Sequence, residues 1–453
     1  MRKSAFQRSS GKLRTLQLAA VIFLTVSGGP YGLEPLFTYV GNHGALLLLL
    51  IIPLLWDVPT ILAVLELNSL MPVTGGYYQW VKHALGIRWA FFEGWWTWLY
   101  TFLDLAIYPV LFITYASFFF PEIAAYKLPI CLVIIWSSAI LNILGIVQVG
   151  RASVLLGVMV LVPFLLIFLH LAHPGVHHFY PLTDRSVNSI TFPALSMGLY
   201  TVMWNFLGWD NATTYAGEVA RPVRSYLVSV CIAFVLILGV YLLTAISVQR
   251  SGIDPSLLNT DGLGFPLLGD LVGGRRLGII VAIGGMASQL GLYSAVLLSV
   301  SRVPQVMADD QLLPAWFCIL HPRFKTPYVS ILVSSVIVSI LVLFTFSDLI
   351  VMDIMLYGAG LFLEFLALLL LRHKEPATHR PFRIPLGKAG LILLFLLPIG
   401  IYTLALSGAL LSSDKTGPIY FALGMLFSAP IAWQFIRRRK VLSNPTRGVR
   451  KYL

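Results

Sequence analysis

Long apolar runs separated by short polar loops dominate the chain. Twelve of these runs have roughly the 18–25 residues that a helix needs to cross a bilayer. The pattern therefore predicts an all-α polytopic membrane protein with 12 transmembrane helices. The expected spans are 15–38, 45–67, 89–118, 128–146, 152–172, 192–216, 225–248, 277–301, 328–346, 350–371, 389–411 and 418–436.

The composition supports this placement in lipid. Of the 453 residues, 58% are hydrophobic and 11% are charged, whereas soluble domains have about 45–50% apolar and about 25% charged residues. The 19 acidic residues are too few to solvate so much apolar side chain. A soluble globular protein is therefore excluded.

Basic residues gather on one side of the predicted spans. Most of the 31 Lys and Arg residues fall in the two tails and in the loops on the same side as the tails. Because cytoplasmic loops carry such an excess, we expect both termini in the cytoplasm and the protein in the cell (inner or plasma) membrane. The net charge of +12 is then a topology signal, and we expect lipid contact but no nucleic-acid partner. The sequence does not define an oligomeric state.

Two predicted spans are interrupted by residues that disfavour a helix. Span 15–38 contains SGGPYG at residues 27–32, and span 192–216 contains NFLGWD at residues 205–210. Gly is a poor helix former, and Pro removes a backbone hydrogen bond. Unwound backbone at membrane depth persists where it lines a cavity, and paired interruptions in two halves indicate an inverted-repeat transporter. The alternative for the first interruption is a packing kink.

Several motifs resemble the amino acid–polyamine–organocation superfamily, most closely its polyamine-uptake and L-type amino acid transporter branch. They are SGGPYGLE, GGYYQWV, YPVLF, GWDNATTYAGEVARP, SRVPQVMADDQLLP and RPFRIP. The resemblance implies a five-plus-five inverted repeat with broken helices 1 and 6, and alternating access with proton-coupled uptake or exchange of amino acids or polyamines. The implied segments are an N-tail (1–14), two repeats (15–172 and 192–371), two further helices (389–436) and a basic C-tail (437–453).

Eight carboxylates fall inside predicted spans, and no Lys or Arg falls well inside a span. An ionisable group at membrane depth costs about 3 kcal/mol or more and is normally functional or paired. This imbalance favours a cationic substrate, a proton relay, or both. We expect Glu66 to be structural, and Asp57 and Glu93 to be solvated near span ends. The eight are Glu34, Asp57, Glu66, Glu93, Asp104, Asp210, Asp353 and Glu364.

The candidate substrate site combines the two interruptions with the third span. The N–H groups freed by an interrupted helix can bind an anionic group of the substrate. Carboxylates can bind an ammonium group, and an aromatic ring beside a carboxylate also attracts an ammonium. Candidate substrate-binding residues are Ser27, Gly28, Gly29, Gly32, Glu34, Asp104, Asn205, Gly208, Trp209 and Asp210. Candidates for proton coupling are Glu34, Asp104, Asp210 and Glu364. Candidates for gating are Tyr108, Trp209, Tyr293 and Tyr357.

The fifth span does not carry the membrane-embedded lysine that the superfamily resemblance leads one to expect. Residues 152–172 contain only His170 as a basic side chain. Protons carried by carboxylates are therefore the favoured coupling ion. Sodium, for which Thr25, Ser288 and Ser294 offer oxygen ligands, is less favoured, and no other metal or cofactor is expected.

A transporter is the favoured class. The sequence has no Gly-rich phosphate loop, HExxH or GxSxG motif, so no catalytic residues are assigned and an enzyme is disfavoured. Channels usually assemble short pore units around a filter. We expect a secondary active transporter of amino acids or polyamines, with a cationic substrate favoured. A neutral amino acid exchanger of the L-type kind and a channel are the alternatives.

Overall fold

The protein is described by a computed structural model that covers residues 12–172, 190–258, 264–343, 346–412 and 415–443. Within these residues it is all-helical, without a β-strand, apart from one isolated bridge between Leu13 and Val219. The helices are α1 (Thr15–Val26), α2 (Glu34–Ile52), α3 (Val58–Leu70), α4 (Gly76–Leu85), α5 (Ile87–Ala116), α6 (Lys127–Leu144), α7 (Ile146–Ala172), α8 (Phe192–Asn205), α9 (Pro222–Ser251), α10 (Pro255–Leu258), α11 (Gly264–Val300), α12 (Arg302–Asp309), α13 (Tyr328–Leu341), α14 (Phe346–Lys374), α15 (Lys388–Leu410) and α16 (Thr416–Ser443). Short helical segments are η2 (Pro53–Asp57), η3 (Pro121–Tyr126), η5 (Asn211–Glu218) and η6 (Ala315–Cys318).

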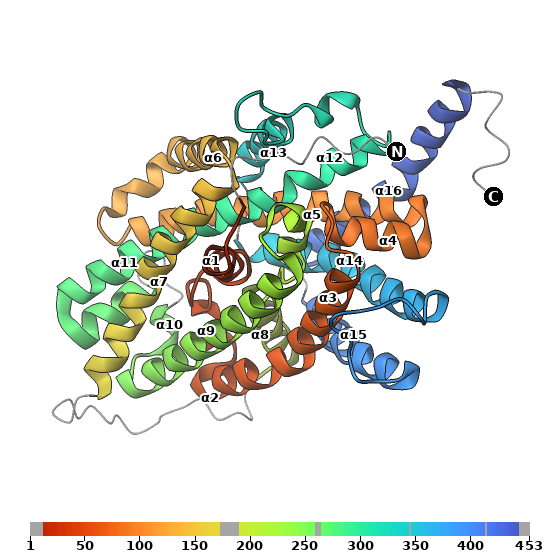
Figure 1. Cartoon of the computed structure of the whole chain (residues 1–453). Helices are drawn as coiled ribbons and strands as arrows, with labels where there is room; N and C mark the ends of the chain where they lie inside the picture. The colour runs from red at the N-terminus through yellow and green to blue at the C-terminus, as the bar shows by residue number, and fades with distance from the viewer. Residues whose placement is uncertain (1–11, 173–189, 259–263, 344–345, 413–414, 444–453) are drawn as a thin grey trace.

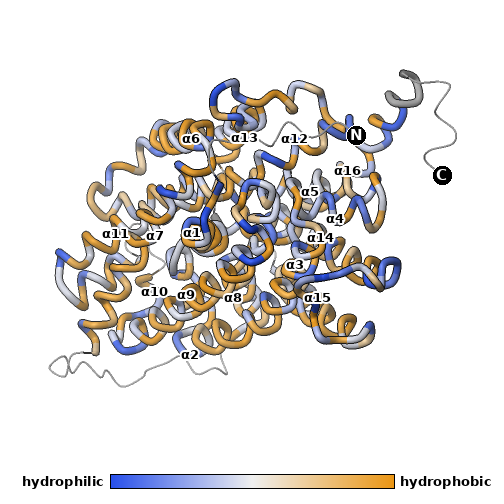
Figure 2. Tube along the Cα trace, in the orientation of Figure 1, coloured by the Kyte–Doolittle hydropathy of each residue, from blue (hydrophilic) through white to orange (hydrophobic). Residues whose placement is uncertain are grey.

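The helices form a multi-pass membrane protein. In the described part of the chain, nine helices are long and apolar enough to cross a bilayer, and α1 and α13 are shorter apolar helices. Figure 2 shows apolar residues along the outer helices, and these include exposed side chains such as Leu155 on α7 and Val235 on α9. Each predicted span contains at least one helix. The number of twelve crossings, like the domain boundaries, stays a prediction.

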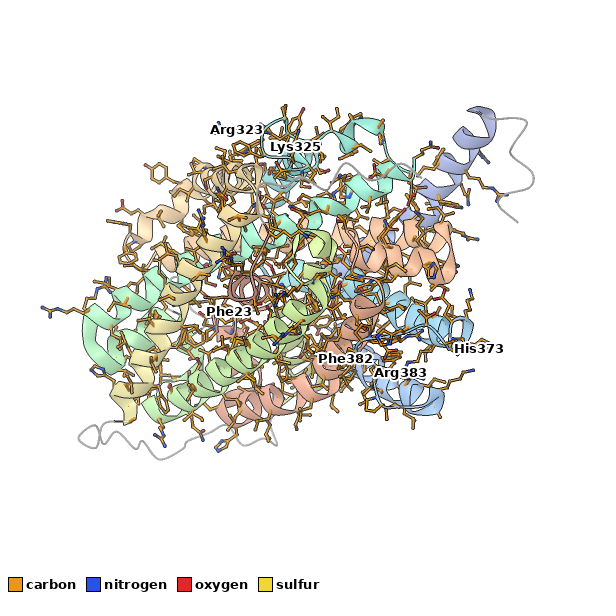
Figure 3. All side chains as sticks on the ribbon, in the orientation of Figure 1. Phe23, Arg323, Lys325, His373, Phe382 and Arg383 are labelled. Carbon is orange, nitrogen blue, oxygen red and sulfur yellow. The ribbon has the colours of Figure 1, made fainter. Side chains whose placement is uncertain are left out.

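The centre of the molecule lies around α1, α5, α11 and α14. In Figure 1, α1 is near the middle of the view, and it packs against α7, α9 and α11. Helix α5 packs against both α11 and α14. Figure 3 places Phe23 of α1 near the centre of the view, whereas Arg323, Lys325, His373 and Arg383 lie in loops and at a helix end toward its edges. The buried helices therefore position any site within the membrane.

Both predicted helix interruptions are confirmed. Helix α1 ends at Val26, and the backbone is not helical again until α2 begins at Glu34. The helical stretch that follows the first interruption is short, because the chain turns at Gly41, whose φ of 69° lies in the left-handed region. Helix α8 ends at Asn205, and the chain continues as the 3₁₀ segment η5 from Asn211.

The expectation that the carboxylates inside the spans have no basic partner is wrong for Glu66. Arg372, in the last turn of α14, donates from Nε to Glu66 Oε1 at 2.7 Å and from Nη2 to Oε2 at 2.5 Å. Arg380 lies 3.5 Å from Oε1. Both arginines come from the predicted loop after span 350–371, which folds back against the end of α3. Glu66 is therefore structural, as expected.

A second buried ion pair joins η5 to α12. Arg302 donates from Nε and Nη2 to the two carboxylate oxygens of Glu218, at 3.0 and 3.2 Å. The Arg302 side chain is 1% exposed and the Glu218 side chain 8%. Such bidentate pairs fix geometry as well as charge. The pair therefore holds the end of η5, which follows the second interruption, against the start of α12, where α11 ends.

Replacing Arg302 with methionine should destabilise the protein by about 3–5 kcal/mol, because it leaves the Glu218 carboxylate buried without its partner. The measurement is the thermal unfolding temperature in detergent. The matched control is Arg276→Met on α11, since Arg276 is exposed. Equal unfolding temperatures for the two variants would contradict a structural role for the pair.

Candidate substrate site

The first interruption depends on glycines with left-handed backbone. Gly28, Gly29 and Gly32 have φ values of 60°, 87° and 98°. Gly28 N–H donates to the Phe23 carbonyl and Gly29 N–H donates to Ser27 Oγ, both at 3.0 Å. A side chain at any of these glycines would be strained, so the interruption follows directly from the sequence.

Tyrosine and serine hydroxyls satisfy the carbonyls that the interruptions free. Ser288 of α11 donates to the Gly28 carbonyl at 2.5 Å. The Tyr241 hydroxyl of α9 lies 2.6 Å from Ser27 Oγ and 2.8 Å from the Asn205 carbonyl, so it joins the two interruptions. Tyr226, also on α9, donates to the carbonyl of Trp209.

A small cavity lies where the two interruptions face α5. It has room for about one water molecule and is therefore too small for an amino acid. Its lining comes from both interrupted helices, α5 and α11. The lining residues are Thr25, Val26, Ser27, Asp104, Tyr108, Trp204, Asn205, Leu207 and Leu292.

Asp104 is the carboxylate that lines this cavity. Its Oδ2 accepts from the Tyr108 hydroxyl at 2.6 Å and its Oδ1 accepts from Trp204 Nε1 at 3.2 Å. Asp353 of α14 interacts electrostatically with Asp104. It is fully buried, and neither of its oxygens has a hydrogen-bond partner among the described residues. Asp104 makes this side of the cavity acidic, and Asp353, which does not line the cavity, adds a second buried carboxyl that interacts with it.

Glu34 lies at the start of α2, away from the cavity lining. Its Oε2 accepts from the Gly32 N–H at 2.7 Å, and its Oε1 accepts from the Tyr115 hydroxyl of α5 at 2.9 Å. Both carboxylate oxygens are thus already engaged. In this state Glu34 stabilises the end of the first interruption.

Asp210 belongs to a second acidic group, on the other side of Tyr357. Its Oδ1 accepts from the Tyr357 hydroxyl at 3.0 Å, and Glu364 of α14 interacts electrostatically with it. Glu93 of α5 interacts electrostatically with both of these carboxyls. All three are buried, with exposed fractions of 1–3%.

Comparison with known proteins identifies the family. The amino acid permease family model matches residues 13–428. The chain belongs to the amino acid permease family. It is therefore a membrane transporter and not an enzyme.

Similar proteins include a probable polyamine transporter of Arabidopsis thaliana, 36% identical over 405 residues that cover 87% of this chain and 82% of the relative. The polyamine transporter PUT1 of Oryza sativa subsp. japonica is 30% identical, covering 96% and 80%. The arginine/ornithine antiporter ArcD2 of Lactococcus lactis subsp. cremoris is 23% identical, covering 63% of each chain. The crystal structure of MhsT in complex with L-phenylalanine shares the fold, with a TM-score of 0.61, 17% identity, and coverage of 88% of this chain and 100% of that one.

The cavity of this transporter brings together only some of the predicted site residues. Ser27, Asp104, Asn205 and the gating candidate Tyr108 line it. The others lie near the interruptions or in the second acidic group, and their roles stay predictions. These others are Gly28, Gly29, Gly32, Glu34, Gly208, Trp209, Asp210, Tyr293, Tyr357 and Glu364.

Trp209 and Tyr293 lie outside the cavity lining. Trp209 Nε1 donates to Asp57 Oδ1 of η2 at 3.1 Å, and its ring packs against Phe234 of α9 with centroids 5.9 Å apart. Tyr293 is fully buried within α11. Gly208, with φ 96°, supplies the turn that carries the second interruption.

The expectation that Asp57 and Glu93 are solvated is wrong, because they are 0% and 1% exposed. Asp57 lies in a π-helical turn inside one long helical segment, and Glu93 faces α14, where a side chain at Gly360 would lie 3.0 Å from its Oε1. Sequence reasoning also left Asp353 without a role. A signal was available: Glu93, Tyr100 and Asp104 have the spacing of Glu364, Tyr357 and Asp353 read backwards.

Replacing Gly32 with alanine should lower both thermal stability and transport. Its φ of 98° disfavours any side chain by about 1–2 kcal/mol, and the added Cβ would lie 2.8 Å from the Trp204 ring. The control is Gly239→Ala on α9, where nothing lies within 4 Å of the added Cβ. Unfolding temperature and uptake rate are measured for both. Unchanged values for Gly32→Ala would contradict the strained geometry.

Proposed function

We propose that this chain is a secondary transporter that moves polyamines or cationic amino acids by alternating access, coupled to protons. The single observation that carries the cationic preference is the buried carboxyl of Asp104 at the cavity, which interacts electrostatically with the buried carboxyl of Asp353. Within the described residues neither forms an ion pair with a basic side chain. A desolvated carboxylate favours an arriving ammonium, which would supply the missing positive charge.

The cavity also supplies aromatic surfaces for an ammonium. Trp204 and Tyr108 line it, and their ring centroids are 6.2 Å apart. A cation near such faces gains attraction from the ring quadrupole, more so when it is desolvated. The relatives named as polyamine transporters and an arginine/ornithine antiporter support the same substrate class.

A neutral amino acid needs a partner for its carboxylate as well as for its amine. The obvious donors are the N–H groups of the first interruption. In the structure the N–H groups of Gly28, Gly29 and Gly32 already donate to the Phe23 carbonyl, Ser27 Oγ and Glu34 Oε2. This arrangement favours a substrate recognised by its amines over one that needs a carboxylate clamp.

Proton coupling is favoured over sodium coupling because the hydroxyl groups proposed as sodium ligands already form hydrogen bonds within the protein. Thr25 donates to the Val21 carbonyl, Ser288 donates to the Gly28 carbonyl, and Ser294 Oγ accepts from Asn142. The first bond lies within α1, and the other two tie α11 to the first interruption and to α6, whereas several buried carboxyl groups have oxygens without a partner among the described residues. We further propose that both termini lie in the cytoplasm and that the protein resides in the cell membrane, because of the placement of its basic residues.

In proteoliposomes, putrescine, spermidine, lysine and arginine should compete with labelled putrescine uptake, and leucine should not. Asp104→Asn should raise the concentration for half-maximal uptake by at least about tenfold, since it removes a charge-assisted contact of about 1.5–3 kcal/mol. Asp309→Asn is the control, because Asp309 is exposed. Competition by leucine alone would overturn the cationic preference in favour of the neutral exchanger.

Collapsing an inward proton gradient at constant sodium should slow the accumulation of labelled substrate. A protonophore is added to proteoliposomes whose membrane potential is clamped with potassium and valinomycin. The control replaces external sodium with choline, which should leave accumulation unchanged. A rate that follows sodium and ignores the protonophore would overturn proton coupling.

A further inference from the structure

Helices α5 and α14 carry the same acidic pattern in opposite directions. On α5 the order is Glu93, Tyr100, Asp104, and on α14 it is Asp353, Tyr357, Glu364. In each helix the carboxylates are eleven residues apart, which is about 16 Å of helix rise and returns to nearly the same face. The two helices pack against each other, so the pattern places carboxyl groups at two levels along the helix axes. One level contains Asp104 and Asp353, and the other contains Glu93 and Glu364.

The two levels differ in their surroundings. Asp104 and Asp353 interact at the level of the cavity, which Asp104 lines. Glu93 and Glu364 interact at the other level, where Asp210 from the second interruption joins them. The rings of Tyr100 and Tyr357 lie between the levels, with centroids 5.4 Å apart and planes at 86°.

Buried carboxyl groups that lie close together without a cation cannot all stay ionised. The Tyr357 hydroxyl donates to Asp210 Oδ1 at 3.0 Å and stabilises Asp210 as the carboxylate, whereas Glu364 Oε2 is buried without a partner among the described residues. One proton is therefore part of this arrangement.

Within the described ranges, no ion pair connects Glu93, Asp210 or Glu364 to a basic side chain. Glu93 Oε2 and Glu364 Oε2 are buried without a hydrogen-bond partner there. The other titratable groups facing the three carboxyls are tyrosines, namely Tyr77 of α4, Tyr100 of α5, Tyr226 of α9 and Tyr357 of α14.

The surroundings of Glu93, Asp210 and Glu364 suit a ligand that is smaller than the substrate. None of the three carboxyls lines the cavity at Asp104. Glu93 is closely packed, because a side chain at Gly360 would lie 3.0 Å from its Oε1. A proton needs no additional space, whereas an ammonium does.

We infer that Glu93, Asp210 and Glu364 form a shared proton site separate from the substrate site at Asp104 and Asp353. The inference rests on the proposed transport function for its role in coupling. Asp210 belongs to the second interruption, whereas Glu93 and Glu364 belong to α5 and α14. Movement of the interrupted helix separates Asp210 from Glu364, hydrates both carboxyls and releases the proton.

Proton occupancy is tested directly on the purified, substrate-free protein. Infrared spectra at neutral pH should show the C=O stretch of a protonated carboxyl, shifted in D₂O, and Glu364→Gln should remove that band. The control is Glu122→Gln, because Glu122 is exposed. If the spectrum of Glu364→Gln retains the full band, the site is not where the proton resides and the inference is wrong. This test does not depend on transport.

Coupling is tested with the same variants in proteoliposomes. At clamped potential, a gradient of one pH unit drives up to about tenfold accumulation per coupled proton in the wild type. Glu364→Gln, which removes the titratable group and keeps the size of the side chain, should keep exchange of labelled for unlabelled substrate near the wild-type rate and lose the pH-driven accumulation. Glu93→Gln should lower accumulation in the same direction.

Two results would overturn the separation of sites. In one, Glu364→Gln reduces exchange and pH-driven accumulation equally, which places Glu364 in the substrate site. In the other, the variant accumulates substrate as the wild type does, which leaves the three carboxyls without a coupling role. Absence of substrate exchange in the wild type would instead refute the proposed function, and the infrared result would still decide whether the proton is bound.

Discussion

Unwound backbone in the middle of two membrane helices is the constraint on which the centre of this protein depends. A carbonyl or N–H group freed at membrane depth finds no water, so a side chain must satisfy it. Tyr241 contacts both interruptions at once, through Ser27 Oγ and the carbonyl of Asn205. Ser288 and Tyr226 each take a further carbonyl. Polar side chains of α9 and α11 therefore set where the interruptions meet, and the cavity lies at that place.

Charge in the membrane is then distributed in two ways. Arg372 neutralises Glu66, and Arg302 neutralises Glu218, where helix ends lie near polar loops. Around the cavity the carboxyls have tyrosine and tryptophan donors instead of basic partners, as at Asp104. The paired charges hold the ends of the helices together, because separating them would leave buried ions. The unpaired carboxyls are left free to exchange a proton or a cation during transport.

Much of the fold follows from the sequence. Apolar length predicts the membrane helices, and the Gly and Pro pattern predicts both interruptions, because these preferences are local. Solvent exposure was less predictable. Asp57 and Glu93 are buried although they were expected near span ends, since η2 continues into α3 without a loop and α14 covers Glu93. Glu66 acquired a partner from a loop more than 300 residues away in sequence.

The sequence by itself determined the class of protein, the two helix breaks and the surplus of carboxylates over basic groups inside the membrane. These properties depend on composition and on neighbouring residues along the chain. Only the tertiary structure decided which carboxylates act together. Asp104 interacts electrostatically with Asp353, and Asp210 with Glu364, because α5 packs against α14 and Tyr357 of α14 donates to Asp210. Such pairings depend on helix rotation and packing, which no local pattern encodes.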